Sequence, residues 1–336
     1  MNRRLFAISL AAAVLGTTGV GIAATASATA SASPESATRG VTERAAAAQA
    51  AEGRPLDILL TNDDGWIGEG GSETPLIVAL RDALRKEGHH VTVVAAGTNQ
   101  TGQGGRISLP PNKLTVANPE KDVYTVTPGS PSDSVYFGMD EIFADKKPDL
   151  VVSGINPGNN LGQAVAHSGT FNAASAALEF GVPSIAVSQD EPKGWAEGGE
   201  LAGEQSAQYV VDLVAKVQNR AGDGPLMPKG AGLNVNLPVR PGPVDPATGK
   251  PGSVLPPKGS KVTTLDTGSW IDFDYKSGDA GADKAGTYEI GLAPTGQQAA
   301  EGTDTRAVQD GYAAVHPFEA DRDVDASTVR WAGGLL

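Results

Sequence analysis

The stretch "LDILLTNDDG", residues 56–65, gives the clearest indication of the fold of this chain. Its first five residues form an apolar run of strand length, and the run ends in two adjacent acids followed by a glycine. Charges at the end of a buried strand cost free energy unless a ligand or a donor offsets them. The stretch therefore predicts a buried strand that opens, at its carboxyl end, onto a polar site.

The same alternation continues outward from this strand. Residues 74–88 have apolar side chains three and four residues apart, which predicts an amphipathic helix, and residues 90–96 read as a second strand. Further strands are predicted at 149–154, 182–188 and 230–239, and further helices at 169–181 and 203–220. Strands that alternate with helices form right-handed βαβ units. We therefore expect an α/β fold with a doubly wound, Rossmann-like, mainly parallel sheet.

The N-terminal residues 1–52 and the residues after 239 differ in composition from the alternating strands and helices between them. Residues 1–32 combine two arginines, a short apolar run and small A-x-A sites, which is typical of a secretory signal peptide, possibly of the twin-arginine type. An uncleaved anchor is the alternative, but the apolar run is short for a bilayer span. Residues 33–52 read as a linker and residues 53–336 as one α/β domain, in which 240–302 are a loop-rich extension with hairpins.

Composition narrows the possible functions. The chain has 336 residues, a formal net charge of −13 and no cysteine. Disulfides and thiolate chemistry are excluded, and the acidity argues against binding of a nucleic-acid polymer. No second long apolar run follows the first, so we expect a secreted protein that does not bind membranes.

Three polar loops follow predicted strands and should converge at one edge of the sheet. Asp63 and Asp64 lie in the first loop, and the other two loops offer neutral oxygens from Thr101, Asn156 and Asn160. Carboxylate and neutral oxygens suit Mg²⁺, Mn²⁺ or Ca²⁺. The alternative is an ordinary turn, because Asp and Gly are turn residues.

The run "HSGT", residues 167–170, precedes a predicted helix. Hydroxyls and backbone N–H groups at a helix N-terminus can bind an anion such as phosphate. A simple helix cap at Ser168 is the competing interpretation. A metal beside an anion cradle would indicate phosphoryl chemistry.

Several motifs together resemble the SurE-type survival-protein nucleotidases. They are "ILLTNDDG", "PGSPSDSVYFG", "PDLVVSGINPGNNLG", "HSGTFNAA", "GVPSIAVS", "LNVNLP" and "GTDTRAVQDGYAAVHP", in the family's order and spacing between Leu56 and Pro317. The resemblance implies a phosphatase that hydrolyses nucleoside 5′- and 3′-monophosphates with water activated by one divalent cation, Mg²⁺ or Mn²⁺. It also implies that the C-terminal hairpin region helps to form a homodimer or tetramer.

The resemblance further implies roles for individual residues. The metal ligands are Asp63, Asp64, Thr101 and Asn156, and the phosphate-facing residues are Asn160, Ser168, Gly169 and Thr170. Asp63, Asp64, Asn160, Ser168 and Asp304 are the expected catalytic set.

The sequence departs from the family's usual pattern at a few positions, which are Thr101 for serine, His167 for tyrosine, Ala176 for glutamate and Arg306 for histidine. These changes leave the metal ligands intact and bear on substrate preference. Two rivals to the nucleotidase are considered. One is a phosphatase with an aspartate nucleophile, although its D-x-D spacing is missing here. The other is an exported protein that binds a nucleotide or metal without turnover.

Overall fold

The computed structural model describes residues 53–67, 74–190, 196–248, 251–268, 271–278, 284–294, 298–319 and 330. The predicted signal peptide and linker lie outside these residues. Residues Ala51–Leu336 form one compact unit. No helix in the described part of the chain is long and apolar enough to cross a membrane.

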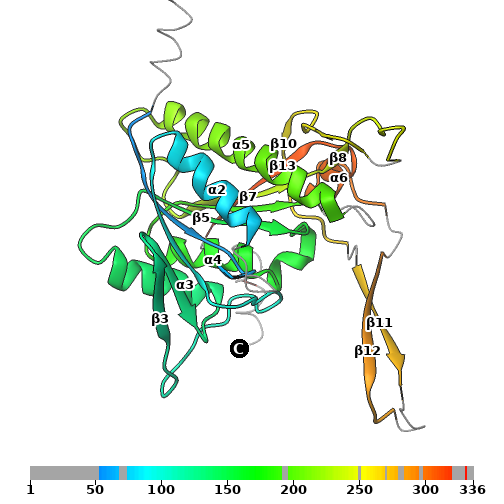
Figure 1. The fold of residues 1–336 in the computed structure, drawn as a ribbon, viewed down its shortest axis with the longest axis horizontal. Helices are drawn as coiled ribbons and strands as arrows, with labels where there is room; N and C mark the ends of the chain where they lie inside the picture. The colour runs from blue at the N-terminus through cyan, green and yellow to red at the C-terminus, as the bar shows by residue number, and fades with distance from the viewer. Residues whose placement is uncertain are drawn as a thin grey trace, which may run out of the picture. The chain divides into compact units, whose positions relative to one another are not determined.

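A nine-stranded sheet forms the centre of this unit, in the order β10-β13-β7-β6-β5-β1-β2-β4-β3 (Figure 1). Neighbouring strands from β7 to β4 run parallel, whereas β13 is antiparallel to β7 and β3 is antiparallel to β4. The strands are β1 (Asp57–Thr61), β2 (His90–Ala96), β3 (Thr115–Glu120), β4 (Val123–Thr127), β5 (Leu150–Pro157), β6 (Ser184–Gln189), β7 (Ala231–Leu237), β10 (Ser260–Val262) and β13 (Ala313–Glu319). The expected mainly parallel α/β sheet is confirmed.

Helices cover both faces of the sheet (Figure 1). Along β1, Ile58 and Leu60 pack into one apolar cluster with helices α2 and α5, while Leu59 packs on the opposite side with α3 and α4. The helices are α2 (Pro75–Lys86), α3 (Pro131–Phe137), α4 (Gly169–Glu179), α5 (Ala196–Ala221) and α6 (Asp304–Gln309), with short turns at Gly138–Ile142 and Gly162–Ala166. Burial on both faces explains why Ile58, Leu59 and Leu60 follow one another in β1 without polar alternation.

The elements predicted from apolar periodicity all form, with shifts of a few residues at their ends, and α5 begins earlier, at Ala196. The apolar pattern of the sequence did not predict β3, β4, α3, α6 or β13. Helices α3 and α6 are 7 and 6 residues long, too short for a clear helical period. Strand β3, "TVANPE", is largely exposed and contains a proline, which is typical of an edge strand.

The predicted extension at 240–302 contains hairpins in its described parts. Strands β8 (Arg240–Pro241) and β9 (Val254–Leu255) form one antiparallel pair, and β11 (Ile271–Ser277) and β12 (Tyr288–Pro294) form another. Strand β10 differs from the expectation, because it joins the edge of the main sheet beside β13.

A buried histidine ties the start of β1 to the end of α2. The N–H of Leu56 donates to Nδ1 of His89 at 3.2 Å, so the ring must accept at that nitrogen. Burial lowers the pKa of His89 below its usual 6.5. The unfolded chain therefore takes up this proton at a higher pH than the folded chain does.

We predict that the free energy of unfolding is highest above pH 6.5 and decreases as the pH falls below it. One proton accounts for at most about 1.4 kcal/mol per pH unit. Urea unfolding at pH 7.5 and 5.5 measures this change. His89→Asn, which keeps an acceptor but does not titrate, should show a smaller decrease. An equal decrease in His89→Asn and wild type would contradict the assignment.

Candidate metal and phosphate site

The predicted site residues lie at the switch point of the sheet, where the strand order proceeds to opposite sides of β1. Strand β1 pairs with β2 on one side and with β5 on the other, so the chain order diverges at β1. Asp63 and Asp64 follow β1, and Asn156 lies at the carboxyl end of β5. Ligands of open parallel sheets bind at this position, beyond the carboxyl ends of strands at the switch point.

The turn after β1 is fixed by its own residues. The Nδ2 group of Asn62 and the hydroxyl of Thr74 both donate to the carbonyl oxygen of Gly65, at 3.1 and 2.7 Å. Gly65 has φ +86°, and a Cβ there would lie 2.9 Å from the carbonyl carbon of Thr98. The "NDDG" run thus forms a tight turn that holds the two carboxylates beside the loop after β2.

Trp66 is a structural residue of this turn. Its side chain is buried beneath Arg81, whose guanidinium carbon lies 5.2 Å from the ring centroid. Arg81 also pairs with Glu120 of β3. The indole therefore anchors the turn to the helix layer and does not offer a free face for stacking on a base.

The N-terminus of α4 points at the Asp63 carboxylate. The hydroxyl of Thr170 donates to Oδ1 of Asp63 at 2.8 Å, and the N–H groups of Gly169 and Thr170 also stabilise its charged form. Burial nevertheless dominates and raises the pKa of Asp63. Among the described residues, no Lys, Arg or His pairs with Asp63. A buried carboxylate held by neutral donors favours the approach of a cation.

Gly169 makes this approach of helix and carboxylate possible. A Cβ at this position would lie 2.7 Å from Cβ and 2.9 Å from Oδ2 of Asp63, and 3.0 Å from Cγ of Pro131. The first turn of α4 therefore needs glycine because of space.

The loop after β2 reaches the same turn. The N–H of Gln100 donates to the carbonyl oxygen of Asp63 at 2.6 Å, which places Thr101 one residue further along. Thr101 is exposed, and its N–H donates to Oδ1 of Asn99. The structure thus brings the Thr101 backbone to the site, but the Thr101 hydroxyl forms no hydrogen bond with the carboxylate of Asp63 or Asp64.

Asn156 has its side-chain amide fixed at the carboxyl end of β5. Its side-chain nitrogen donates to the carbonyl oxygens of Gly158, at 2.7 Å, and Pro157, at 3.4 Å. These bonds fix the amide and leave Oδ1 as the group that a cation can take. Gly154 allows the close passage of β5 beside β6, because a Cβ there would lie 2.3 Å from the carbonyl oxygen of Val187.

Asn160 is held by two asparagines that the sequence analysis did not single out. Its N–H donates to Oδ1 of Asn236, and its carbonyl oxygen accepts from the side chains of Asn234 and Asn236. Its Nδ2 donates to Ser188 at 2.8 Å, and one amide hydrogen remains. The alternate positions of Asn234 and Asn236 on one strand, in "LNVNLP", were the available signal.

The structure divides the "SGT" residues between two roles. The Ser168 side chain caps α4 by accepting the N–H of Phe171 at 2.9 Å, so its hydroxyl hydrogen stays available to a ligand. Thr170 was expected to face phosphate, but its hydroxyl hydrogen is directed to Asp63. Because Asp63 already lies at the N-terminus of α4, Gly169 and Thr170 act on the carboxylate in this arrangement.

Asp304, expected to be catalytic, is a buried backbone anchor. Its two carboxylate oxygens accept the N–H groups of Gly162, Asp266 and Thr305, at 2.8 to 2.9 Å. The carboxylate thus ties the turn after Asn160 to the loop after β10 and to the start of α6. Both carboxylate oxygens are thus engaged by backbone N–H groups, and in this structure Asp304 positions these segments.

Asp133 is a second carboxylate that anchors loop backbone, and its role was not predicted from the sequence. Its carboxylate accepts the N–H groups of Ser108 and Ser130 and the hydroxyl of Ser108. Ser130 and Asp133 form a capping box at the start of α3, which the spacing S-P-S-D could have indicated. This clamp fixes the loop that contains Thr101 against α3.

The donor set fits a hard divalent cation. Asp63 and Asp64 supply carboxylates and Asn156 an amide oxygen, which suit Mg²⁺ or Mn²⁺. Within the described ranges, no three His, Cys, Asp or Glu side chains gather as a metal site. A cation here would therefore rely on neutral oxygens and water for its remaining ligands.

Fold and site together define a class, namely doubly wound α/β proteins with an oxygen-rich, acidic site at the switch point. The family model described as "Survival protein SurE" matches residues 58–270, and the chain belongs to this family.

Individual relatives agree with this placement. A 5′-nucleotidase SurE from Aquifex aeolicus is 36% identical over 265 residues, covering 78% of this chain and 92% of that protein. A 5′-nucleotidase SurE from Vibrio cholerae is 33% identical over 267 residues, covering 79% of this chain and 92% of that protein. The crystal structure of a SurE protein from Aquifex aeolicus superposes with a TM-score of 0.64 at 32% identity, covering 83% of this chain and 98% of that one.

Proposed function

We propose that the protein is a divalent-metal-dependent phosphomonoesterase that hydrolyses nucleoside 5′- and 3′-monophosphates. The observation behind the proposal is the buried Asp63 carboxylate, held by α4 and lacking a basic partner among the described residues, beside Asp64. The names of the relatives, which are 5′-nucleotidases, support the substrate class.

Asp63, Asp64 and Asn156 would hold the cation, with Thr101 as a further ligand from the neighbouring loop. When bound, the cation supplies positive charge to the phosphate and acidifies a water molecule. This role needs no covalent intermediate on the chain.

The remaining residues bind and orient the phosphate. The hydroxyl of Ser168 and the free amide hydrogen of Asn160 can donate to its oxygens, where charge is spread during transfer. Hydrogen bonds from Asn234 and Asn236 of β7 hold the backbone of Asn160 in place. Asp304 holds the turn that follows Asn160 by accepting the N–H of Gly162. These anchors limit movement of the donors, which favours a preorganised site.

Phosphate release tests the proposal. We expect purified protein to release phosphate from AMP and from 3′-AMP. Excess EDTA should abolish this release, and added Mg²⁺ or Mn²⁺, but not Na⁺, should restore it. Release from p-nitrophenyl phosphate alone would indicate a general phosphatase. Folded protein that binds nucleotide without release under any metal would favour the rival, a binding protein without turnover.

Export and assembly form part of the same proposal. Fractionation of the producing cells, with N-terminal sequencing of the recovered protein, tests cleavage near residue 32. Light scattering of the purified protein tests for a homodimer or tetramer. A cell-bound protein with its N-terminus intact would contradict export.

A further inference from the structure

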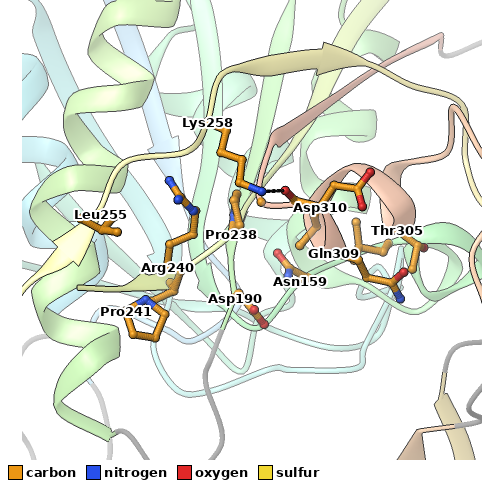
Figure 2. A pocket seen from close by; sticks show the side chains of 14 residues that line it. Asn159, Asp190, Pro238, Arg240, Pro241, Leu255, Lys258, Thr305, Gln309 and Asp310 are labelled. Carbon is orange, nitrogen blue, oxygen red and sulfur yellow. Dashed lines mark hydrogen bonds between the residues drawn. The ribbon is translucent and has the colours of Figure 1, made fainter. Parts of the chain in front are cut away.

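A cavity of about 530 Å³ is lined by residues other than the candidate metal and phosphate residues. Figure 2 shows the side chains that line it. Asn159 and Leu161 line it on either side of Asn160, and Thr305 lines it next to Asp304. The cavity therefore shares its wall with the loop expected to hold phosphate, at the carboxyl ends of β6 and β7.

Two cations converge on this cavity. A Cβ at Gly311 would lie 3.3 Å from Nε of Arg240 and 3.3 Å from Cε of Lys258, so both side chains pack against the same glycine. Arg240 donates to the carbonyl oxygen of Pro256, and Lys258 donates to that of Asp310 at 2.7 Å. Neither forms an ion pair with a described carboxylate. Lys258 also lies over the ring of Tyr312, with Nζ 5.9 Å from its centroid. Two neighbouring cations repel each other, and an anion beside them would offset that repulsion.

The acids of the cavity do not neutralise this pair. The carboxylate of Asp310 is engaged by Arg306 at 3.0 Å and by Lys261 at 3.7 Å. Asp190 also lines the cavity, next to Asn159 in Figure 2. Two cations thus face one further carboxylate, in a protein whose formal net charge is −13.

One side of the cavity is apolar, whereas Asn159, Thr305 and Gln309 add neutral polar groups to the rest of its lining. Val239 and Leu161 are buried, and Pro238, Pro241 and Leu255 complete this side of the cavity. Apolar walls with a few polar groups suit a small organic ligand, whereas an inorganic anion would use only the cations.

We propose that this cavity binds the leaving group of the substrate, and that the preferred leaving group carries a second phosphate on a nucleoside body, as in a nucleoside 3′,5′-bisphosphate. The inference rests on the proposed function, because it assumes that one phosphate is hydrolysed beside Asn160. Arg240 and Lys258 bind the second phosphate through charge-assisted hydrogen bonds, and the apolar walls contact the nucleoside.

Calorimetry with the full protein tests the cavity without turnover. Adenosine 3′,5′-bisphosphate in EDTA should bind more tightly than AMP and than inorganic triphosphate. Arg240→Gln and Lys258→Gln should each weaken its binding about tenfold, the effect of one hydrogen bond to a charged group. Arg220→Gln and Lys229→Gln, exposed and at the amino end of β7, serve as matched controls that keep wild-type affinity.

Kinetics with Mg²⁺ separate this inference from the proposed function. In Arg240→Gln, the ratio of kcat/KM for the bisphosphate to that for p-nitrophenyl phosphate should fall about tenfold, through KM. Equal losses on both substrates, or triphosphate binding as tight as the bisphosphate, would overturn the assignment. Absence of release from every substrate would overturn the proposed function, and the calorimetry would still decide whether the cavity binds the bisphosphate.

Discussion

Asp63→Asn is expected to lower kcat for AMP by at least about 1,000-fold, because it removes a charged ligand from the cation. The substitution keeps an acceptor for the Thr170 hydroxyl, so α4 should retain its place. It also removes a buried negative charge. We therefore expect the metal-free variant to melt no lower than metal-free wild type.

Asp57→Asn is the matched control, at the opposite end of the same strand. Asp57 pairs there with Lys146 and His90 on the surface. Its replacement should leave kcat unchanged, and exposed pairs contribute little to stability. Phosphate release by a folded Asp63→Asn protein at the wild-type rate would show that the site is assigned to the wrong residues.

Gly169→Ala is expected to lower kcat about 100-fold while the protein stays folded. The added methyl group would lie 2.7 Å from Cβ and 2.9 Å from Oδ2 of Asp63, so the carboxylate must move. A displacement of this kind in a reacting centre typically costs about two orders of magnitude. Alanine also favours helices more than glycine does, so α4 itself should not be weakened.

Gly252→Ala provides the control for this experiment. A Cβ at Gly252 meets nothing within 4 Å, and its substitution should change neither kcat nor the melting temperature. Affinity for Mn²⁺ should fall in Gly169→Ala together with kcat. Wild-type activity in Gly169→Ala would mean that the Asp63 carboxylate need not lie at the N-terminus of α4 during turnover.

The central sheet was predictable because its signals are local. An apolar run such as 56–60, bounded by polar turns and followed by an amphipathic helix at 74–88, indicates a βα unit on its own. The edge elements lack such signals. Strand β3 has exposed polar residues, and β13 becomes a strand mainly through its pairing with β7.

The site was predictable as a set of loops but not as a set of contacts. Sequence position placed Asp63, Asn156 and Ser168 at one edge of the sheet, because parallel strands align their carboxyl ends. It could not show that Thr170 donates to Asp63, since that bond joins residues 107 positions apart. The anchoring part of Asp304 likewise depends on segments that meet only in the folded chain.

Anomalous diffraction at the Mn absorption edge, from crystals grown with Mn²⁺, locates the cation directly. We predict one strong peak per subunit, bonded to the carboxylates of Asp63 and Asp64 and to Oδ1 of Asn156, at about 2.1 Å. The same crystals should show no such peak for Asp63→Asn. A peak bound elsewhere, in a protein whose phosphate release depends on Mn²⁺, would contradict the account.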